Sequence, residues 1–417
     1  MEEKLIINGG KKLYGQIKVD SSKNAFLPIL AGTLLCNNQV CLKNYVNLSD
    51  LRAMRQILEE LDCNTYLNGN NLIIDPTNAS FSRIGHELTT KLRASIFLLG
   101  PMLARFKKAI IAYPGGCRIG ARPIDIHLKG LRALGAKIIE RHGYLYCYGE
   151  NMKSGTFVLD FASVGATESL MMSAILLSGR TTLKNVAKEP EVEDLQNFLN
   201  AMGARINGAG TDTIVIDGVN SLSGGEYCVM SDRIVAGTYL LAAASCGGEI
   251  ELTNTNPKHN ESLISFLSQT ACKIETFSDK IKLKADKRLS SIKKIQTLPY
   301  PNFPTDLQPQ MMVLQSVSEG TCLLTENLFE NRFGIVSELD KMGADITIKN
   351  HSALIRGVEK LYGADVFATD LRAGAGLVLA GLVAEGYTTI SNIDFIDRGY
   401  EKIEEKFKLL QADIKRI

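Results

Sequence analysis

The sequence predicts an α/β protein of two domains, built from six copies of one unit of about 70 residues. Three observations predict this fold class: a repeated junction between a helix and a strand pair, an apolar helix ahead of each junction, and the length of 417 residues. A chain of this length is too long for one ordinary core and fits two large domains or several repeats. The composition, 45% hydrophobic and 22% charged, is that of an ordinary globular protein.

The repeated junction runs from the end of an amphipathic helix into residues that form two strands. Successive copies start 68 to 73 residues apart. The copies are LEELDCNTYLNGNNLII from Leu58, LRALGAKIIERHGYLYCYG from Leu131, LNAMGARINGAGTDTIVIDG from Leu199, LSQTACKIETFSDKIKLKA from Leu267, LDKMGADITIKNHSALIRG from Leu339 and LLQADIKRI from Leu409. A fixed period of this kind indicates one supersecondary unit repeated along the chain.

An apolar helix precedes each junction. The six segments are SKNAFLPILAGTLL, LRASIFLLGPMLA, VGATESLMMSAILLSG, DRIVAGTYLLAAASCGG, TDLQPQMMVLQSVSEG and DLRAGAGLVLAGLVAEG. They carry apolar residues on nearly every face, which predicts helices inside a domain, whereas GYEKIEEKFKLLQA has a charged face and belongs outside. We therefore expect two domains of three units, each with sheets wrapped around central helices.

A glycine-rich loop, PGGCRIGARPIDI from Pro114 to Ile126, is the strongest candidate for chemistry. We expect it between an apolar strand at 109–113 and an amphipathic helix that begins near Ile124. Arg118 and Arg122 would favour the thiolate of Cys117 and make it reactive or competent in acid-base catalysis. A lone cysteine is more often a buried structural residue; the surrounding glycines and arginines favour the reactive interpretation.

Cations stand at the starts of several apolar helices, where the helix dipole disfavours them. These residues are Lys23, followed by Asn24, and Arg93, Arg233 and Arg372, with Arg122 and Arg398 on loops. A polyanionic ligand bound between two domains would explain them. The alternative is that they reach solvent or pair with acids such as Asp232 and Asp370.

Two acids accompany these cations. In LPYPNFPTDLQPQ, the prolines predict an extended approach to Asp306, which would open the fifth apolar helix. Asp306 could be only a helix cap, and Asp370 has the same ambiguity. A carboxylate in a cationic cleft is also the group that takes a proton from a hydroxyl nucleophile.

Several function classes are excluded by composition and spacing. A net charge of +2 leaves no global basic field for nucleic acid, and the start MEEKLIINGG is acidic, without the apolar run of a signal peptide or membrane helix. Nine cysteines without a C-x-x-C pair indicate reduced thiols in a cytoplasm, and five scattered histidines indicate no metal site. Walker A and dinucleotide fingerprints are missing. We expect no cofactor and no obligate protein partner.

Eight motifs together carry a resemblance. The loop PGGCRIGARPID, with SKNAFLPIL, LRAS, SVGAT, FPTDLQ, ENRFG, ATDLRA and IDRGYE in the same order, resembles the UDP-N-acetylglucosamine 1-carboxyvinyltransferase family of the EPSP synthase superfamily over the whole chain. The resemblance implies an inside-out α/β barrel of two domains, residues 23–230 and residues 1–22 plus 231–417, with the active-site cleft between them. It also implies transfer of enolpyruvyl from phosphoenolpyruvate to the sugar 3-hydroxyl, with release of phosphate, as the first step of peptidoglycan synthesis, and inhibition by fosfomycin.

The resemblance also assigns roles to residues. Catalysis would use Asp306 as the base for the 3-hydroxyl and Cys117 as the acid that protonates the phosphoenolpyruvate methylene. Phosphoenolpyruvate would be bound by Lys23, Asn24, Arg122 and Arg398. The nucleotide sugar would be bound by Arg93, Arg122, Pro123, Ile124, Asp125, Ile126, Ser163, Val164, Asp306 and Leu328. Domain closure would bring in Arg332, Asp370 and Arg372.

Four positions depart from the family pattern. Phe161 stands where the family usually has lysine, Val235 where it has glutamate, Tyr300 where histidine is common, and Ser21 where it has glycine. Two rival functions are considered. One is the sister transferase acting on shikimate 3-phosphate, which lacks the PGGC loop, and the other is a catalytically silent paralogue that binds the nucleotide sugar.

Overall fold

A computed structural model describes residues 3–114, 119–120, 124–286 and 288–417. The chain divides into two compact units. The N-terminal unit comprises Ser21–Gly116 and Arg122–Met230, and the C-terminal unit comprises Met1–Asp20, Cys117–Ala121 and Ser231–Ile417. Cys117, Arg118, Arg122 and Pro123 of the glycine-rich loop lie outside the described residues.

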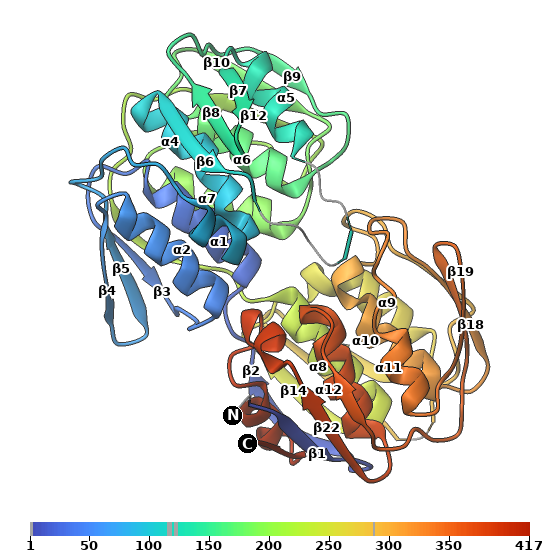
Figure 1. The fold of residues 1–417 in the computed structure, drawn as a ribbon. Coiled ribbons are helices and arrows are strands. Elements are labelled where there is room, and N and C mark those ends of the chain that lie inside the picture. Colours follow the sequence, from blue (N-terminus) through green and yellow to red (C-terminus); the bar gives the residue numbers. More distant parts are fainter. Residues whose placement is uncertain (1–2, 115–118, 121–123, 287) are drawn as a thin grey trace. The chain divides into compact units, whose positions relative to one another are not determined.

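The N-terminal unit contains three sheets within its described residues, with strand orders β13-β3-β5-β4, β6-β8-β7 and β11-β12-β10-β9 (Figure 1). The strands are β3 (Val40–Lys43), β4 (Asn64–Asn68), β5 (Asn71–Asp75), β6 (Lys108–Ala112), β7 (Lys137–Arg141), β8 (Tyr144–Tyr148), β9 (Thr156–Val158), β10 (Arg180–Lys184), β11 (Arg205–Asn207), β12 (Thr213–Asp217) and β13 (Gly225–Cys228). The helices are α1 (Lys23–Thr33), α2 (Ser49–Glu60), α3 (His86–Lys91), the 3-10 helix η1 (Arg93–Leu98), α4 (Leu99–Phe106), α5 (Asp125–Ala133), α6 (Val164–Ala174) and α7 (Pro190–Ala201).

The C-terminal unit also has three sheets in its described part, ordered β21-β22-β1-β23, β15-β16-β14-β2 and β17-β18-β20-β19. Its strands are β1 (Leu5–Asn8), β2 (Leu13–Lys18), β14 (Gly248–Thr253), β15 (Lys273–Thr276), β16 (Lys280–Ala285), β17 (Lys294–Gln296), β18 (Thr321–Thr325), β19 (Asp345–Lys349), β20 (Ser352–Arg356), β21 (Asp365–Phe367), β22 (Tyr387–Ser391) and β23 (Asp413–Arg416). Its helices are α8 (Arg233–Cys246), η2 (Pro257–Asn260), α9 (Glu261–Ser268), η3 (Thr305–Leu307), α10 (Gln308–Val317), α11 (Val336–Lys341), α12 (Leu371–Val383), η4 (Ile393–Arg398) and α13 (Ile403–Leu409).

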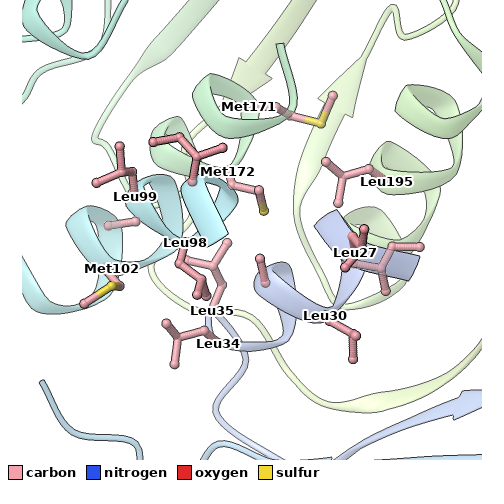
Figure 2. Close-up of a cluster of buried hydrophobic side chains, with 14 of the residues drawn as sticks. Leu27, Leu30, Leu34, Leu35, Leu98, Leu99, Met102, Met171, Met172 and Leu195 are labelled. Atoms are coloured by element: carbon pink, nitrogen blue, oxygen red, sulfur yellow. The ribbon is translucent and has the colours of Figure 1, made fainter. Parts of the chain in front are cut away.

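The apolar helices form the centres of the units, as their sequences predict. In the C-terminal unit α8, α10 and α12 pack on one another, and all but the last two residues of α8 are buried (Figure 1). In the N-terminal unit Leu27 and Leu30 of α1, Met172 of α6 and Leu99 of α4 meet in one apolar cluster (Figure 2). Each unit therefore has its own hydrophobic core.

The strand pairs bury one face against these helices. β16 and β20 alternate buried and partly exposed residues, the pattern of an antiparallel pair with one wet face. A two-residue turn joins β7 to β8, with His142 at φ 51° and Gly143 at φ 75°. Positive φ at both positions is the geometry that matches the twist of the flanking strands.

Five helices that precede a strand pair end in a similar way. Gly135, Gly203 and Gly343 take positive φ values of 96°, 106° and 89°, while Asp62 and Gln411 take 59° and 65° after their helices. A left-handed residue directly after a helix satisfies its last carbonyls and turns the chain away. These five helix ends therefore share a backbone conformation.

The last strand pair is completed by the start of the chain. β23 has β1 as its antiparallel partner, with Leu5 opposite Arg416, and β1 pairs on its other side with β22. β2 lies parallel to β14 in a second sheet. The first 20 residues thus supply strands to two sheets of the C-terminal unit.

Candidate active site

The described part of the glycine-rich loop is held by backbone contacts within the C-terminal unit. The Ile119 carbonyl accepts a hydrogen bond of 3.0 Å from the Asn331 amide. Gly120 has φ +140°, and a Cβ there would lie 2.0 Å from a Glu330 carboxylate oxygen. The end of the Glu330 side chain could move aside, but the positive φ is a backbone conformation that favours glycine. β6 and α5 flank the loop as predicted.

Helices α5, α6 and η1 of the N-terminal unit pack together. Ile124 is buried and precedes α5, Asp125 is exposed in the first turn, and Ile126 is half-buried. A Cβ added at Gly165 of α6 would lie 3.1 Å from the His127 ring of α5 and 3.5 Å from the Phe97 ring of η1. The His127 side chain, in the first turn of α5, therefore packs against the first turn of α6.

The residues of the SVGAT and LRAS motifs lie at these same helix starts. Ser163 caps α6, its hydroxyl accepting from the Ala166 amide at 3.4 Å, and Val164 is the first helical residue. Arg93 is the first residue of η1 and is half-buried. Phe161 stands where lysine was expected from the family resemblance. Its side chain is 49% exposed and carries no charge, so this position supplies no cation.

Lys23 is paired with an acid that the sequence patterns did not single out. Its ammonium lies 3.1 Å from a carboxylate oxygen of Asp50, and the two side chains are 10% and 5% exposed. Lys23 opens α1 behind its cap Ser22, and Asn24 beside it is half-buried. Asp50 lies in the first turn of α2, an ordinary place for an acid, which is why sequence alone gave it no role.

Asp306 is the centre of a charged cluster in the C-terminal unit. One carboxylate oxygen accepts from Arg332 Nη2 at 2.8 Å, and the other accepts from Arg372 Nη2 at 2.8 Å and Nε at 3.1 Å. The arginine side chains are 2% and 4% exposed, whereas the Asp306 side chain is 28% exposed. The carboxylate is thus the accessible member of a cluster whose cations are buried.

The electrostatics of the cluster favour the charged form of Arg372. Burial lowers the pKa of Arg372, but the attraction of Asp306, Tyr400 and Asp232 outweighs burial and raises that pKa above its usual value. The charged guanidinium in turn donates two hydrogen bonds to one oxygen of the Asp306 carboxylate, and such charge-assisted bonds are stronger than neutral ones.

The capping interpretation of Asp370 is confirmed, and Asp306 lies in the first turn of η3. Neither η3 nor α10 has a side-chain cap hydrogen bond. Asp370 caps α12 by accepting from the amides of Arg372 at 2.9 Å and Ala373 at 3.1 Å, and lies 3.9 Å from Arg332 Nη1. The expected extended approach is wrong, because the chain turns before Asp306, with the Asn302 amide donating to the Pro299 carbonyl at 3.1 Å.

A buried glutamate that sequence reasoning missed ties two predicted site residues together. Glu326 is 1% exposed and accepts from the Leu328 amide at 2.8 Å, while its other oxygen accepts from the Thr305 hydroxyl at 3.0 Å. Thr305 directly precedes Asp306, so Glu326 holds the segments of Asp306 and Leu328 side by side. No local pattern marks a single acid after a strand.

The remaining cations take separate places. Arg233, first in α8 behind its cap Asp232, lies over the Tyr300 ring at 5.5 Å. Both line a hollow of about 280 Å³, partly open to solvent, with Lys258 and Asn260. Arg398 ends η4 and is half-buried.

The described residues lack two features of other classes of protein, a metal-binding cluster and a membrane-spanning helix. No group of three or more histidine, cysteine, aspartate or glutamate side chains among them could hold a metal ion. Across that same part of the chain, no helix combines the length and the apolar character needed to cross a membrane.

Comparison with known proteins assigns the family. The sequence model of EPSP synthase (3-phosphoshikimate 1-carboxyvinyltransferase) matches residues 7–407. The chain belongs to the EPSP synthase family. Solved structures agree with this family's mixed α/β fold: the enolpyruvyl transferase NikO from Streptomyces tendae has a TM-score of 0.88 at 22% identity, over 100% of this chain and 99% of that one. EPSP synthase from Acinetobacter baumannii has a TM-score of 0.77 at 18% identity, over 100% of both.

Within the EPSP synthase family, relatives of much higher identity carry one name. UDP-N-acetylglucosamine 1-carboxyvinyltransferase 2 of Caldanaerobacter subterraneus subsp. tengcongensis is 50% identical over 99% of both chains. UDP-N-acetylglucosamine 1-carboxyvinyltransferase of Geobacter metallireducens is 48% identical over 100% of this chain and 99% of the relative, and that of Desulforapulum autotrophicum is 45% identical over 100% of both.

Proposed function

We propose that the protein transfers the enolpyruvyl group of phosphoenolpyruvate to the 3-hydroxyl of UDP-N-acetylglucosamine and releases phosphate. The observation that carries this is the 45–50% identity, over essentially whole chains, to relatives with that named activity. The reaction is the first committed step of peptidoglycan synthesis, and the cysteine pattern supports a cytoplasmic location.

The proposed reaction is an addition followed by an elimination. Asp306 takes the proton of the 3-hydroxyl as the oxygen attacks C2 of phosphoenolpyruvate, and Cys117 delivers a proton to the methylene carbon. A tetrahedral ketal results. A methyl proton then returns to the Cys117 thiolate, and phosphate leaves with the proton that Asp306 had taken, which forms the enol ether and restores both groups. The exposed, arginine-supported carboxylate of Asp306 supports its part in this scheme.

Binding residues are proposed from both units. Lys23, Asn24, Arg122 and Arg398 would hold phosphoenolpyruvate, since three cations match the charge of a phosphate and a carboxylate. Arg93, residues 122–126, Ser163, Val164, Asp306 and Leu328 would hold the nucleotide sugar, and the adjacent helix starts of α5 and α6 support this. Arg332, Asp370 and Arg372 would complete the site on closure.

The proposed architecture is more detailed than the mixed α/β fold that the family shares. We infer six equivalent units in two inside-out barrels of three, divided near residues 22 and 230. Three sheets around central helices in each unit support the inference.

The sister activity is the second candidate, because the matching family model is described as 3-phosphoshikimate 1-carboxyvinyltransferase. Phosphate release separates the candidates when phosphoenolpyruvate is combined with UDP-N-acetylglucosamine or with shikimate 3-phosphate. We expect release only with the nucleotide sugar. Release only with shikimate 3-phosphate would support the sister activity, and tight nucleotide-sugar binding without release would support the silent paralogue.

The role of Cys117 is tested by two substitutions. Cys117→Asp keeps a group that can donate a proton and should retain transfer activity, whereas Cys117→Ser should lose on the order of 10² to 10⁴ in rate. An epoxide phosphonate should alkylate the wild-type thiol and spare Cys117→Asp, as intact mass would show. An unmodified, fully active wild-type protein would contradict the assignment of Cys117 as a reactive thiol.

A further inference from the structure

A buried polar network lies behind Arg372, on the side away from Asp306. Arg372 Nη1 donates to the Tyr400 hydroxyl at 3.4 Å. That hydroxyl is 2.7 Å from the Thr238 hydroxyl, and Gln310 Nε2 lies 3.1 Å from Thr238 and 3.4 Å from Tyr400. Thr238 and Gln310 are 0% exposed and Tyr400 is 2% exposed. The three side chains come from α8, α10 and the segment after η4.

One direction in the network follows from its donors, because a guanidinium can only donate and Tyr400 therefore accepts from Arg372. The Thr238 hydroxyl is within hydrogen-bond distance of the Ile234 carbonyl at 2.9 Å and of the Tyr400 hydroxyl at 2.7 Å, and either hydroxyl can donate to the other. The network thus runs from Arg372 through Tyr400 to Thr238 and the Ile234 backbone.

This direction fixes the orientation of the Arg372 guanidinium. Its Nε and Nη2 face Asp306, and its Nη1 is taken by Tyr400. A planar guanidinium held on both edges cannot rotate without breaking one set of bonds. Burial raises the pKa of Tyr400, which keeps its phenol protonated and able to act as the donor to Thr238.

We propose that Tyr400, oriented by Thr238 and Gln310, is a positioning residue that acts through Arg372 on the Asp306 carboxylate. Tyr400 does not touch the reacting atoms in this scheme. Its effect is to hold the Nε and Nη2 edge of Arg372 against one oxygen of Asp306 and so to fix the orientation of the carboxylate. The inference rests on the proposed function of Asp306 as the base.

The kinetic test uses Tyr400→Phe, which removes the hydroxyl and keeps the ring. We expect kcat/KM to fall about 3- to 10-fold, the value of one neutral hydrogen bond. We also expect the acidic limb of its pH profile to move to higher pH, because a looser Arg372 stabilises the ionised carboxylate less. Thr238→Val should act in the same direction, and Thr238→Ser, which keeps the hydroxyl, should restore the wild-type profile.

Tyr239→Phe is the matched control. Tyr239 is the neighbour of Thr238 on α8, is 2% exposed, and packs its ring on Phe407 at 5.3 Å between centroids. This variant loses a buried phenol outside the network and should leave the pH profile unchanged. A lowered rate with an unmoved acidic limb in Tyr400→Phe would overturn the positioning role, as would an equal shift in Tyr239→Phe.

A second readout does not depend on turnover. The Nε–H signal of Arg372 can be followed by nuclear magnetic resonance in ligand-free protein labelled with ¹⁵N-arginine and assigned by its loss in Arg372→Lys. The signal should shift in Tyr400→Phe and Thr238→Val but not in Tyr239→Phe, and an unmoved signal would overturn the proposal. If the signal shifts while Asp306→Asn turns over normally, the positioning of Asp306 stands and its proposed function as the base fails.

Discussion

Each unit contains a buried or half-buried aspartate whose carboxylate accepts hydrogen bonds, and the donors differ between the two units. In the N-terminal unit Asp194 is 8% exposed and accepts from the Tyr227 hydroxyl at 2.7 Å and the Met230 amide at 3.1 Å, both neutral. In the C-terminal unit Asp306 accepts from two guanidiniums. Burial raises the pKa of Asp194 to about 6, even though its hydrogen bonds oppose this. The two acids thus differ in exposure as well as in the charge of their partners, since the Asp306 side chain is 28% exposed.

Asp306→Asn tests the guanidinium side of this comparison and should have the largest effect. Turnover should fall by on the order of 10² to 10⁴, the usual cost of removing a general base. The free energy of unfolding should also fall by about 1.5–3 kcal/mol, because two buried arginines lose a charged acceptor. If Asp306 were only a helix cap, the substitution would lower the free energy of unfolding by less than about 1 kcal/mol.

Phosphate release and urea unfolding followed by circular dichroism measure both effects; the chain has no tryptophan to report by fluorescence. Asp365→Asn, an exposed aspartate of the same unit, is the control. Normal turnover in Asp306→Asn would require a different base.

The Lys23 and Asp50 pair tests a third arrangement, in which one buried acid meets one buried cation. Lys23→Met should lose about 3 kcal/mol of unfolding free energy, since it leaves the Asp50 carboxylate buried without this partner. Adding Asp50→Asn should restore much of that stability. Binding of phosphoenolpyruvate should stay lost in the double variant, because the cation itself is absent.

Urea unfolding and calorimetric titration separate these two roles of Lys23. A double variant as unstable as the single variant would show that the pair is not the source of the loss. Recovered binding in the double variant would remove Lys23 from the proposed phosphoenolpyruvate site.

Asp194→Asn tests the aspartate that has neutral donors. The quantity to measure is the pH dependence of the free energy of unfolding. Because the folded pKa of about 6 exceeds the unfolded value near 3.8, the folded state holds the extra proton between these values. Wild-type stability should therefore decrease as pH rises from about 4 to about 6, by up to about 3 kcal/mol from this group. The variant should lack this slope. Exposed Asp212→Asn should keep it, and an equal slope in Asp194→Asn would refute the assignment.

Tyr227→Phe should have the smallest effect. It removes one neutral donor to Asp194 and keeps the ring that packs on Phe198 at 5.4 Å. We expect a loss of about 1 kcal/mol. The loss should be greater at pH 7 than at pH 5, because the phenol favours the charged carboxylate. Unfolding curves at both pH values measure it, and a loss independent of pH would point to packing instead.

Local patterns in the sequence predicted several individual helices correctly. Segments such as DRIVAGTYLLAAASCGG became the buried helix α8, and the helix expected near Ile124 begins as α5. Apolar periodicity reports burial within a single element, so it identifies such helices. It also placed Lys23, Arg93, Arg233 and Arg372 correctly at or near helix starts.

The partners of these residues could not be predicted in the same way. Asp50 is 27 residues from Lys23, and Asp306 is 66 residues from Arg372. These contacts depend on how elements pack, and no spacing rule along the chain encodes them. A capping rule for Asp306 is likewise local, and it says nothing of the two arginines that contact its carboxylate.

The position of β1 between β22 and β23 has a consequence for biosynthesis. The ribosome makes β1 first and β23 last, so the sheet that contains them cannot close until nearly the whole polypeptide has emerged. Residues 21–230 are contiguous apart from the glycine-rich loop and can condense earlier. Until β22 has also been made, Leu5 and Ile7, both fully buried in the finished protein, have no partner strand in this sheet. A nascent chain interrupted shortly before residue 387 would therefore carry a complete N-terminal unit and an unprotected apolar strand, the kind of segment that chaperones bind.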